Sequence, residues 1–258
     1  MSSHSWDPDR YLTYADERGR PFLDLVSRIP AEDPRRVVDL GCGPGNLTGI
    51  LPGRWPGADV VGLDSSPEMI ERANTSQVAG VRFEAADLRA WRPAEPVDVL
   101  VSNATLQWVP GHLELLPHLV AQVAPGGWFA FQVPGNFAEP SHVLLHQLGE
   151  DERFSPFLRG IARPDSHDSG TYLEALLDLG CQVDAWETTY LHLLGGEDPL
   201  FTWISATGAR PTLQALPDEL RVEFEQAYKP LLRDAYPAGP HGTVLPFRRV
   251  FVVARVRA

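Results

Sequence analysis

A glycine-rich turn preceded by an acidic residue is the sharpest chemical signal in the sequence. Residues 39–45 read Asp-Leu-Gly-Cys-Gly-Pro-Gly, so that Gly41, Gly43 and Gly45 alternate behind Asp39. Glycine tolerates positive φ and lets a ligand approach the backbone closely. A dinucleotide-binding turn has the spacing Gly-x-Gly-x-x-Gly, whereas here the third glycine comes one residue early and Asp39 would repel a pyrophosphate. The motif favours a ligand with positive charge or free amino groups, and an ordinary glycine-rich turn is the alternative.

Three more polar residues follow later apolar runs, namely Asp64, Asp87 and Asn103. Asp64 can accept both ribose hydroxyls of a nucleoside, or it can simply cap a helix. Asp87 can accept from the exocyclic amine of a purine, and Asn103 would lie beside the reacting atoms. Because the carboxyl ends of parallel strands meet at one edge of a sheet, we expect these residues to line one ligand site.

Alternating strands and helices must position these residues. Apolar runs predict strands at residues 36–40, 59–63, 81–85, 97–102, 128–133, 182–190 and 249–256. Start and stop signals predict helices at residues 46–51, from 67 after Ser65 or Ser66, and at 112–123, 139–148, 171–179, 199–207 and 218–235, with a polar connection at 156–169. This order predicts an α/β fold with a mostly parallel sheet and helices on both faces. We expect one domain over residues 1–258, with an N-terminal cap at 1–34 and lid insertions at 137–170 and 195–240 over the carboxyl edge.

Composition and charge argue against several classes of function. The chain carries 22 Lys and Arg against 34 Asp and Glu, for a net charge of −12, which disfavours nucleic acid and anionic lipid as partners. No signal peptide or membrane-spanning helix is expected. Two cysteines, Cys42 and Cys181, predict a reducing, cytoplasmic location. His142 and His146 are four residues apart without an evident third ligand, so no metal is expected.

Together these positions resemble those of the S-adenosylmethionine-dependent methyltransferases with a Rossmann-like sheet. The motif at residues 39–45, Asp64, Asp87 and Asn103 match that family's cofactor positions in order. The resemblance implies a seven-stranded sheet that binds S-adenosylmethionine, with the glycines around the methionine moiety, Asp64 at the ribose and Asp87 at the adenine. Ser65 joins this cofactor-binding set, and Met69 would pack on the purine face unless it is an ordinary inward-facing helix residue.

Nearly the whole chain has a narrower resemblance, to the trans-aconitate methyltransferases. Residues 6–8, 17–21, 103–108, 134–136, 188–192, 206–211 and 247–251 carry it. Residues 149–168 depart from the family pattern, so we assign no substrate contact there. The resemblance implies transfer of the sulfonium methyl group to a carboxylate of a small polycarboxylic acid, which gives a methyl ester.

A carboxylate acceptor needs little chemical activation by the protein. Its pKa in solution is near 4, so it is already ionised at neutral pH and requires no general base. The protein must instead hold the reacting oxygen in line with the methyl carbon. We therefore expect positioning by Asn103, Gln107 and Trp108 rather than a certain catalytic residue, although Trp108 is equally explained as core filling.

An acidic protein needs local cations to bind a polyanionic acceptor. Arginine offers two N–H groups to one carboxylate, and the candidates are Arg18, Arg20, Arg210 and Arg249. Arg210 and Arg249 are favoured because they lie in the C-terminal segments that carry the resemblance. A solvated surface ion pair is the alternative for each arginine, although strand alternation makes Arg249 a poor core residue.

Three further polar residues are candidate donors to the acid. Tyr190 and His192 are two residues apart on a predicted strand and therefore share a face. Asn136 follows the fifth predicted strand. The alternatives are a structural role for His192 and a turn role for Asn136.

Three other functions stay open from the sequence. A methyltransferase acting on a nitrogen, oxygen or carbon of another metabolite would often want a base near the acceptor and fewer arginines. An NAD-type oxidoreductase is disfavoured by the early Gly45 and by Asp39. A binding or regulatory protein could keep the fold without turnover. The sequence does not predict the oligomeric state.

Overall fold

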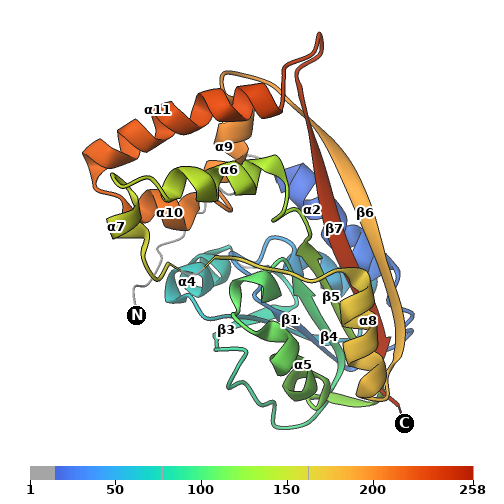
Figure 1. Ribbon diagram of the computed structural model, residues 1–258. Coiled ribbons are helices and arrows are strands. Elements are labelled where there is room, and N and C mark those ends of the chain that lie inside the picture. The colour runs from blue at the N-terminus through green and yellow to red at the C-terminus, as the bar shows by residue number, and fades with distance from the viewer. Residues whose placement is uncertain (1–14, 77, 162, 258) are drawn as a thin grey trace.

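A twisted seven-stranded sheet forms the centre of the molecule (Figure 1). The computed structural model describes residues 15–76, 78–161 and 163–257, with side chains from residue 19 onward. The strand order is β3-β2-β1-β4-β5-β7-β6. The strands are β1 (Arg36–Leu40), β2 (Asp59–Asp64), β3 (Val81–Ala85), β4 (Val97–Asn103), β5 (Val123–Pro134), β6 (Gln182–Leu194) and β7 (Thr243–Arg255).

The direction of the strands brings five of their carboxyl ends to one edge. Strands β3, β2, β1, β4 and β5 pair in parallel. Strand β7 pairs antiparallel with both β5 and β6. The expected fold class, a Rossmann-like and mostly parallel seven-stranded α/β sheet, is confirmed.

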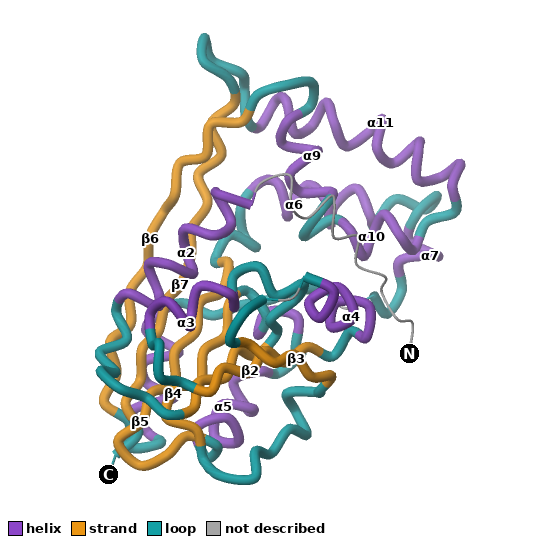
Figure 2. The backbone as a smooth tube through the Cα atoms, turned by 180° about the vertical axis from the view of Figure 1, so that it is seen from behind, coloured by secondary structure: helices purple, strands orange, loops and turns teal. Residues whose placement is uncertain are grey.

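Helices cover both faces of this sheet. On one face, α5 (His112–Val120) and α8 (Ser169–Asp178) contribute Leu116, Leu119 and Tyr172 to a buried cluster. On the other face lie α2 (Ala15–Ser27), η1 (Thr48–Ile50), α3 (Leu51–Arg54) and α4 (Pro67–Thr75), seen from behind in Figure 2. Phe22 and Leu25 of α2 are fully buried against the sheet. Ser66 caps α4 by accepting a hydrogen bond from the Met69 amide at 3.2 Å, as the sequence predicted.

A second layer of helices lies across the carboxyl edge, and we call it the lid (Figure 1). It consists of α6 (Pro140–Gly149), α7 (Ser155–Leu158), α9 (Pro199–Ser205), α10 (Arg210–Ala215) and α11 (Asp218–Ala235). Its helices bury a hydrophobic cluster that includes Phe154, Phe201, Phe224 and Tyr228, together with Leu194, Leu245 and Phe247 of β6 and β7. The lid is thus anchored by apolar burial on the β6–β7 pair, whereas the five parallel strands contribute none of the buried members of this cluster.

Several expected boundaries are wrong. The helix expected at residues 46–51 begins later, as η1 followed by α3, and the expected connection at 156–169 contains part of α7. Helix α10 was not predicted, β6 ends later than predicted, and β7 begins earlier, so that the two strands form a long antiparallel pair. Of the expected cap at residues 1–34, residues 1–14 lie outside the described residues, and α2 packs on a face of the sheet. None of the helices described is long and apolar enough to cross a membrane.

Candidate functional site

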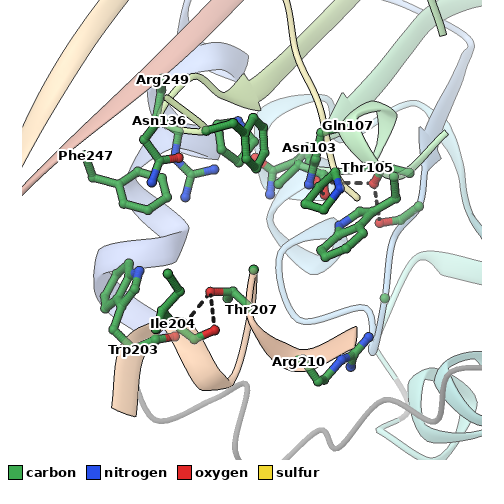
Figure 3. A pocket seen from close by; sticks show the side chains of 18 of the residues that line it. Asn103, Thr105, Gln107, Asn136, Trp203, Ile204, Thr207, Arg210, Phe247 and Arg249 are labelled. Carbon is green, nitrogen blue, oxygen red and sulfur yellow. Dashed lines mark hydrogen bonds between the residues drawn. The ribbon is translucent and has the colours of Figure 1, made fainter. Parts of the chain in front are cut away.

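A cavity of about 340 Å³ lies between the carboxyl edge of the sheet and the lid. Figure 3 shows Asn103, Asn136 and Arg249, which come from the sheet side, facing Trp203 and Arg210 of the lid. Most of the predicted site residues line this cavity. They are Asp39, Gly41, Gly43, Asp64, Ser65, Met69, Asn103, Gln107, Trp108, Asn136, Arg210 and Arg249.

The glycine turn forms part of one wall of the cavity and is hydrogen-bonded to the neighbouring strand β2. The amides of Gly41 and Cys42 both donate to the carbonyl of Leu63, at 2.7 and 2.9 Å. Gly43 and Gly45 have φ values of 57° and 80°, which side chains rarely adopt. A Cβ on Gly45 would lie 2.4 Å from the Phe83 ring, whereas a Cβ on Gly43 would meet nothing within 4 Å. Gly45 is therefore required for packing, and Gly43 leaves the backbone open toward the cavity.

Two carboxyl groups line the cavity beside the glycine turn, of which Asp39 is buried and Asp64 is half-buried. Asp39 accepts from the Thr48 hydroxyl at 2.6 Å through Oδ2, and its Oδ1 has no hydrogen-bond partner among the described residues. Asp64 accepts from the amides of Gly43 and Ser66, both at 2.9 Å. Burial raises the pKa of Asp64, and it raises the pKa of Asp39 to about 7, with the nearby Asp64 charge adding to that rise. A cationic ligand here would relieve the cost of ionising both groups.

Other predicted cofactor residues vary in their placement. Met69 is buried and Ser65 is exposed, and both line the cavity. Gly45 and Asp87 are not among the described residues that line the cavity. Asp87 is exposed, and its carboxylate accepts from the Arg89 guanidinium at 2.6 Å. Its contact with adenine stays a prediction.

The segment after β4 connects the glycine turn to the rest of the cavity. The Thr105 hydroxyl donates to the carbonyl of Gly41 at 3.3 Å. Ala104 has a φ of 52°, a left-handed conformation that is strained for a residue with a side chain. The Gln107 amide donates to the Ala104 carbonyl at 2.5 Å, and its Oε1 has no hydrogen-bond partner within the described part of the chain. This turn therefore places Asn103, Gln107 and Trp108 along one wall.

Two buried arginines line the cavity from facing sides (Figure 3). Arg249 of β7 is 5% exposed, and its guanidinium lies 4.5 Å from the centre of the Phe247 ring. Arg210, at the start of α10, is 8% exposed. Asn136 is buried on the same side as Arg249, with no described partner for its Oδ1. Neither arginine is a solvated surface residue. Their burial therefore fits the predicted place in the ligand pocket better than a surface ion pair.

Three predicted acceptor residues whose side chains are described do not line the cavity. Tyr190 donates to the Asp24 carboxylate at 2.5 Å, and Arg20 is exposed, 5.8 Å from the Tyr190 ring. His192 packs at 4.7 Å on Trp203, which lines the cavity in front of it. The backbone of Arg18 lies in α2, and its side chain lies outside the described residues. Their contact with an acceptor stays a prediction.

Sequence reasoning placed Arg210 of the lid at the site but missed other lid residues that line the cavity. His142 of α6 is buried, and burial lowers its pKa to about 4, so it is neutral at neutral pH. A Cβ on Gly208 would lie 2.5 Å from His142 Nε2, so Gly208 makes room for this ring. Trp203 and Thr207 also line the cavity. Pro211 was the available signal, because proline at the first turn marks the start of α10.

Comparison with known proteins places the fold and site in a class. A family described as a methyltransferase domain matches residues 14–160 of this chain. The crystal structure of the YcgJ protein from Bacillus subtilis has a TM-score of 0.62 at 12% identity and covers 94% of this chain and 99% of its own. A methyltransferase structure from Bacillus halodurans, titled as putative, has a TM-score of 0.59 at 14% identity and covers 93% and 100%. These likenesses concern the fold, and the class is that of the methyltransferase domains.

Relatives along the whole chain narrow this class. A trans-aconitate 2-methyltransferase of Streptomyces avermitilis is 52% identical and covers 98% of both chains. A protein of the same name from Mycobacterium tuberculosis is 48% identical and covers 97% of both. The chain belongs to the trans-aconitate 2-methyltransferase family, and S-adenosylmethionine is its cofactor.

The part of the cavity beside the glycine turn fits this cofactor. The open backbone at Gly43 and the buried carboxyl oxygen of Asp39 offer a cradle for a ligand with a sulfonium and an ammonium group. Asp64 would hold the ribose hydroxyls, and Met69 offers an apolar surface for the purine. Across the described residues, no three His, Cys, Asp or Glu side chains gather as candidate metal ligands.

Proposed function

We propose that this enzyme transfers the methyl group of S-adenosylmethionine to a carboxylate of trans-aconitate and so forms a methyl ester. The relatives at about half identity carry that substrate in their names. The observation that carries the proposal is that one cavity is lined by groups of both charges. Asp39 and Asp64 line it, and so do Arg210 and Arg249, both of which are buried.

The acidic and the basic residues of the cavity lining suit two different ligands. The acidic residues favour a cation, whereas guanidinium groups bind carboxylates through paired, charge-assisted hydrogen bonds. An acceptor with several carboxylates can leave one of them facing the cofactor while Arg210 and Arg249 hold others. The net charge of −12 would otherwise repel such an anion. The two buried arginines would therefore offset this repulsion and allow a polyanionic acceptor to bind.

The reaction then requires positioning rather than proton transfer. S-adenosylmethionine supplies a methyl group on a positive sulfur, which keeps the bonding electron pair when a carboxylate oxygen takes the methyl. The acceptor is ionised at neutral pH, and His142, neutral there, need not act as a base. Asn103, Gln107 and Trp108 would fix the acceptor carboxylate, and orientation of this kind is worth roughly 7 to 11 kcal/mol. The lid would exclude water, which strengthens the arginine contacts.

We also propose a cytoplasmic location and a small-molecule acceptor. Cys42 and Cys181 are both buried as free thiols, which is compatible with a reducing compartment. The cavity volume of about 340 Å³ lies in the range of small-molecule sites. The acidic net charge makes nucleic acid an unfavourable partner.

An acceptor screen combined with two variants tests this function. With labelled S-adenosylmethionine, we expect trans-aconitate to be esterified faster than cis-aconitate, isocitrate or an isopropylmalate-like acid. Arg249→Ala should lower kcat/KM for the acceptor roughly 30-fold, since a charged hydrogen bond is worth about 2 kcal/mol, and leave the cofactor Kd nearly unchanged. Asp64→Ala should weaken cofactor binding measured by calorimetry.

The neighbouring arginine is a matched control for this experiment. Arg248 points to the other face of the sheet and pairs with Glu187 at 2.9 Å, so Arg248→Ala should keep wild-type kinetics. Label appearing on an amine or another non-acid metabolite, with none on the four acids, would replace the proposal by a methyltransferase for a different acceptor. Equal loss of both ligands in Arg249→Ala would remove that residue from the acceptor site.

A further inference from the structure

We propose that Gln132 is a positioning residue that sets the orientation of Asn103 and Arg249 toward the acceptor. The inference rests on the proposed function, because it assigns the two residues it orients to the reacting end of the cavity. Gln132 is 1% exposed, is not one of the described lining residues, and touches the cavity only through its partners. It would therefore act on the reaction only through Asn103 and Arg249, without touching the acceptor.

The register of the sheet places these three side chains in one row. Asn103 of β4 pairs directly with Gln132 of β5. Arg249 of β7 pairs with Pro134, which is two residues beyond Gln132 and so on the same face. The Arg249 guanidinium donates to Gln132 Oε1 at 3.1 Å, and Gln132 Nε2 donates to Asn103 Oδ1 at 2.5 Å. The row thus runs across three adjacent strands at the carboxyl edge.

The chemistry of the groups fixes the direction of both hydrogen bonds. A guanidinium has donors and no acceptor, so the Gln132 atom that faces Arg249 must be the oxygen. The other end of the same amide is then the NH2 group, and the Asn103 atom that receives its hydrogen must also be an oxygen. The Asn103 NH2 group is therefore the end left for the cavity, which Asn103 lines. A donor at that position suits an anionic acceptor oxygen.

The surroundings of Gln132 indicate that its amide does more than fill space in the core. Its neighbours along the same face, Ala130, Phe251 and Val253, belong to the buried apolar cluster beneath α2. An amide in such a place is costly unless both of its polar ends are paired. In this structure both ends are paired, and both partners face the ligand site. A methionine would fill the same space without relaying any orientation.

Two substitutions of Gln132 test the relay. Gln132→Met keeps the shape and removes both hydrogen bonds, and we expect kcat/KM for the acceptor to fall at least tenfold while the cofactor Kd stays within about threefold. Gln132→Glu supplies acceptors alone, so Asn103 must turn its NH2 group toward the new carboxylate and present its oxygen to the cavity. We expect this variant to lose at least as much acceptor kcat/KM as Gln132→Met, with kcat lowered as well as KM raised.

A second buried amide provides the control for folding effects. Gln122 is 8% exposed and donates to the His118 carbonyl at 2.8 Å, outside the described cavity lining. Gln122→Met should lower the Tm without changing acceptor kinetics. Acceptor kinetics of wild-type quality in Gln132→Met would overturn the proposal, as would an equal effect of Gln122→Met.

Failure of the relay and failure of the proposed function give different results. If the wild type esterifies none of the acids, the proposed function fails, and crystal structures of wild type and Gln132→Met still report on the relay. We expect the Asn103 amide and the Arg249 guanidinium to move in the variant. Unchanged positions of both groups would overturn the relay whatever the acceptor is.

Discussion

At the scale of single residues, Asp39 is the group whose ionisation should respond to the cofactor. Burial raises its pKa to about 7, so in the absence of a cation it is only partly ionised at neutral pH. A positive ligand beside it favours the carboxylate. Cofactor binding and proton release from Asp39 are therefore linked.

This linkage predicts a pH-dependent cofactor affinity. Between pH 6 and pH 8, calorimetry should show the Kd of S-adenosylmethionine falling roughly tenfold, following the ionised fraction of a group with a pKa of about 7. Asp39→Asn should bind more weakly and lose that slope. A variant with the same slope as wild type would show that another group titrates.

The same group affects stability with a defined sign. An acid whose pKa is higher in the folded than in the unfolded chain binds more protons when folded, so its contribution to the free energy of unfolding falls as the pH rises from about 4 to about 7. Asp39 thus costs stability at neutral pH. The cofactor offsets that cost when it binds.

Residues at strand ends were the most predictable part of the site. Asp39, Asp64 and Asn103 follow from apolar runs that end in a polar residue, and strand alternation alone placed Arg249 in the pocket or in solvent. Tyr190 and His192 share a face of β6, as expected, and the pairing of β6 with β7 puts Arg249 on that face as well. They still do not reach the cavity, because Trp203 from the lid stands in front of His192 and Asp24 engages Tyr190. Those contacts depend on side chains far away in sequence.

At the scale of elements, the strands were predicted better than the lid. Both β1 and β3 match their predicted ranges in full. The buried β1 shows as an apolar run, whereas the edge strand β3 shows as apolar residues alternating with Arg82 and Glu84. Helix α10 is six residues long and follows α9 almost directly, and too few residues remain to show a helical period. His142 was visible on a predicted helix, but its access to the cavity depends on the missing side chain of Gly208.

The apolar cluster that anchors the lid predicts a stronger effect on acceptor binding than on cofactor binding. Phe224 of α11 is fully buried and packs edge-on to Phe154 at 5.0 Å. Phe224→Ala should cost about 3 to 5 kcal/mol of local stability and raise the acceptor KM more than the cofactor Kd, because Arg210 and Trp203 belong to the lid. Steady-state kinetics and hydrogen exchange of the lid helices measure these effects.

Val222 on the same helix is the matched control, since it is 51% exposed. Val222→Ala should change neither the protection of the lid nor the acceptor KM. If Phe224→Ala weakened the cofactor as much as the acceptor, the lid would have to support the binding of both ligands.

At the scale of the whole molecule, the net charge and the local charges act in opposite directions on the acceptor. The net charge of −12 attracts a cationic cofactor from a distance and repels an anionic acceptor. The two buried arginines act only at short range, where salt screens them less.

Salt should therefore change the two association rates with opposite signs. Raising the ionic strength from about 10 mM to about 150 mM shortens the Debye length from roughly 30 Å to 8 Å, so cofactor association should slow and acceptor association should quicken. Stopped-flow measurements at each salt concentration resolve the two rates. Slowing of both would mean that the local field at the cavity mouth, rather than the net charge, steers the ligands.

The fold as a whole followed from the alternation of strands and helices. That alternation predicted a mostly parallel sheet, which the structure confirms, but it did not predict that β7 lies between β5 and β6. This order brings Arg249 next to Gln132 and within one strand of Asn103. No local pattern in the sequence contains that adjacency, because it arises when distant strands pair.

The apolar cluster of the lid contains no buried residue of the five parallel strands, and this has a consequence for how new activities could arise on this scaffold. Mutations that repack Phe154, Phe224 and their neighbours can reshape the acceptor wall while leaving the glycine turn and its carboxylates intact. An ancestral enzyme could thus have changed its methyl acceptor through mutations confined to the lid. Laboratory evolution toward other acids should begin with libraries in α9 and α10 rather than in the strands.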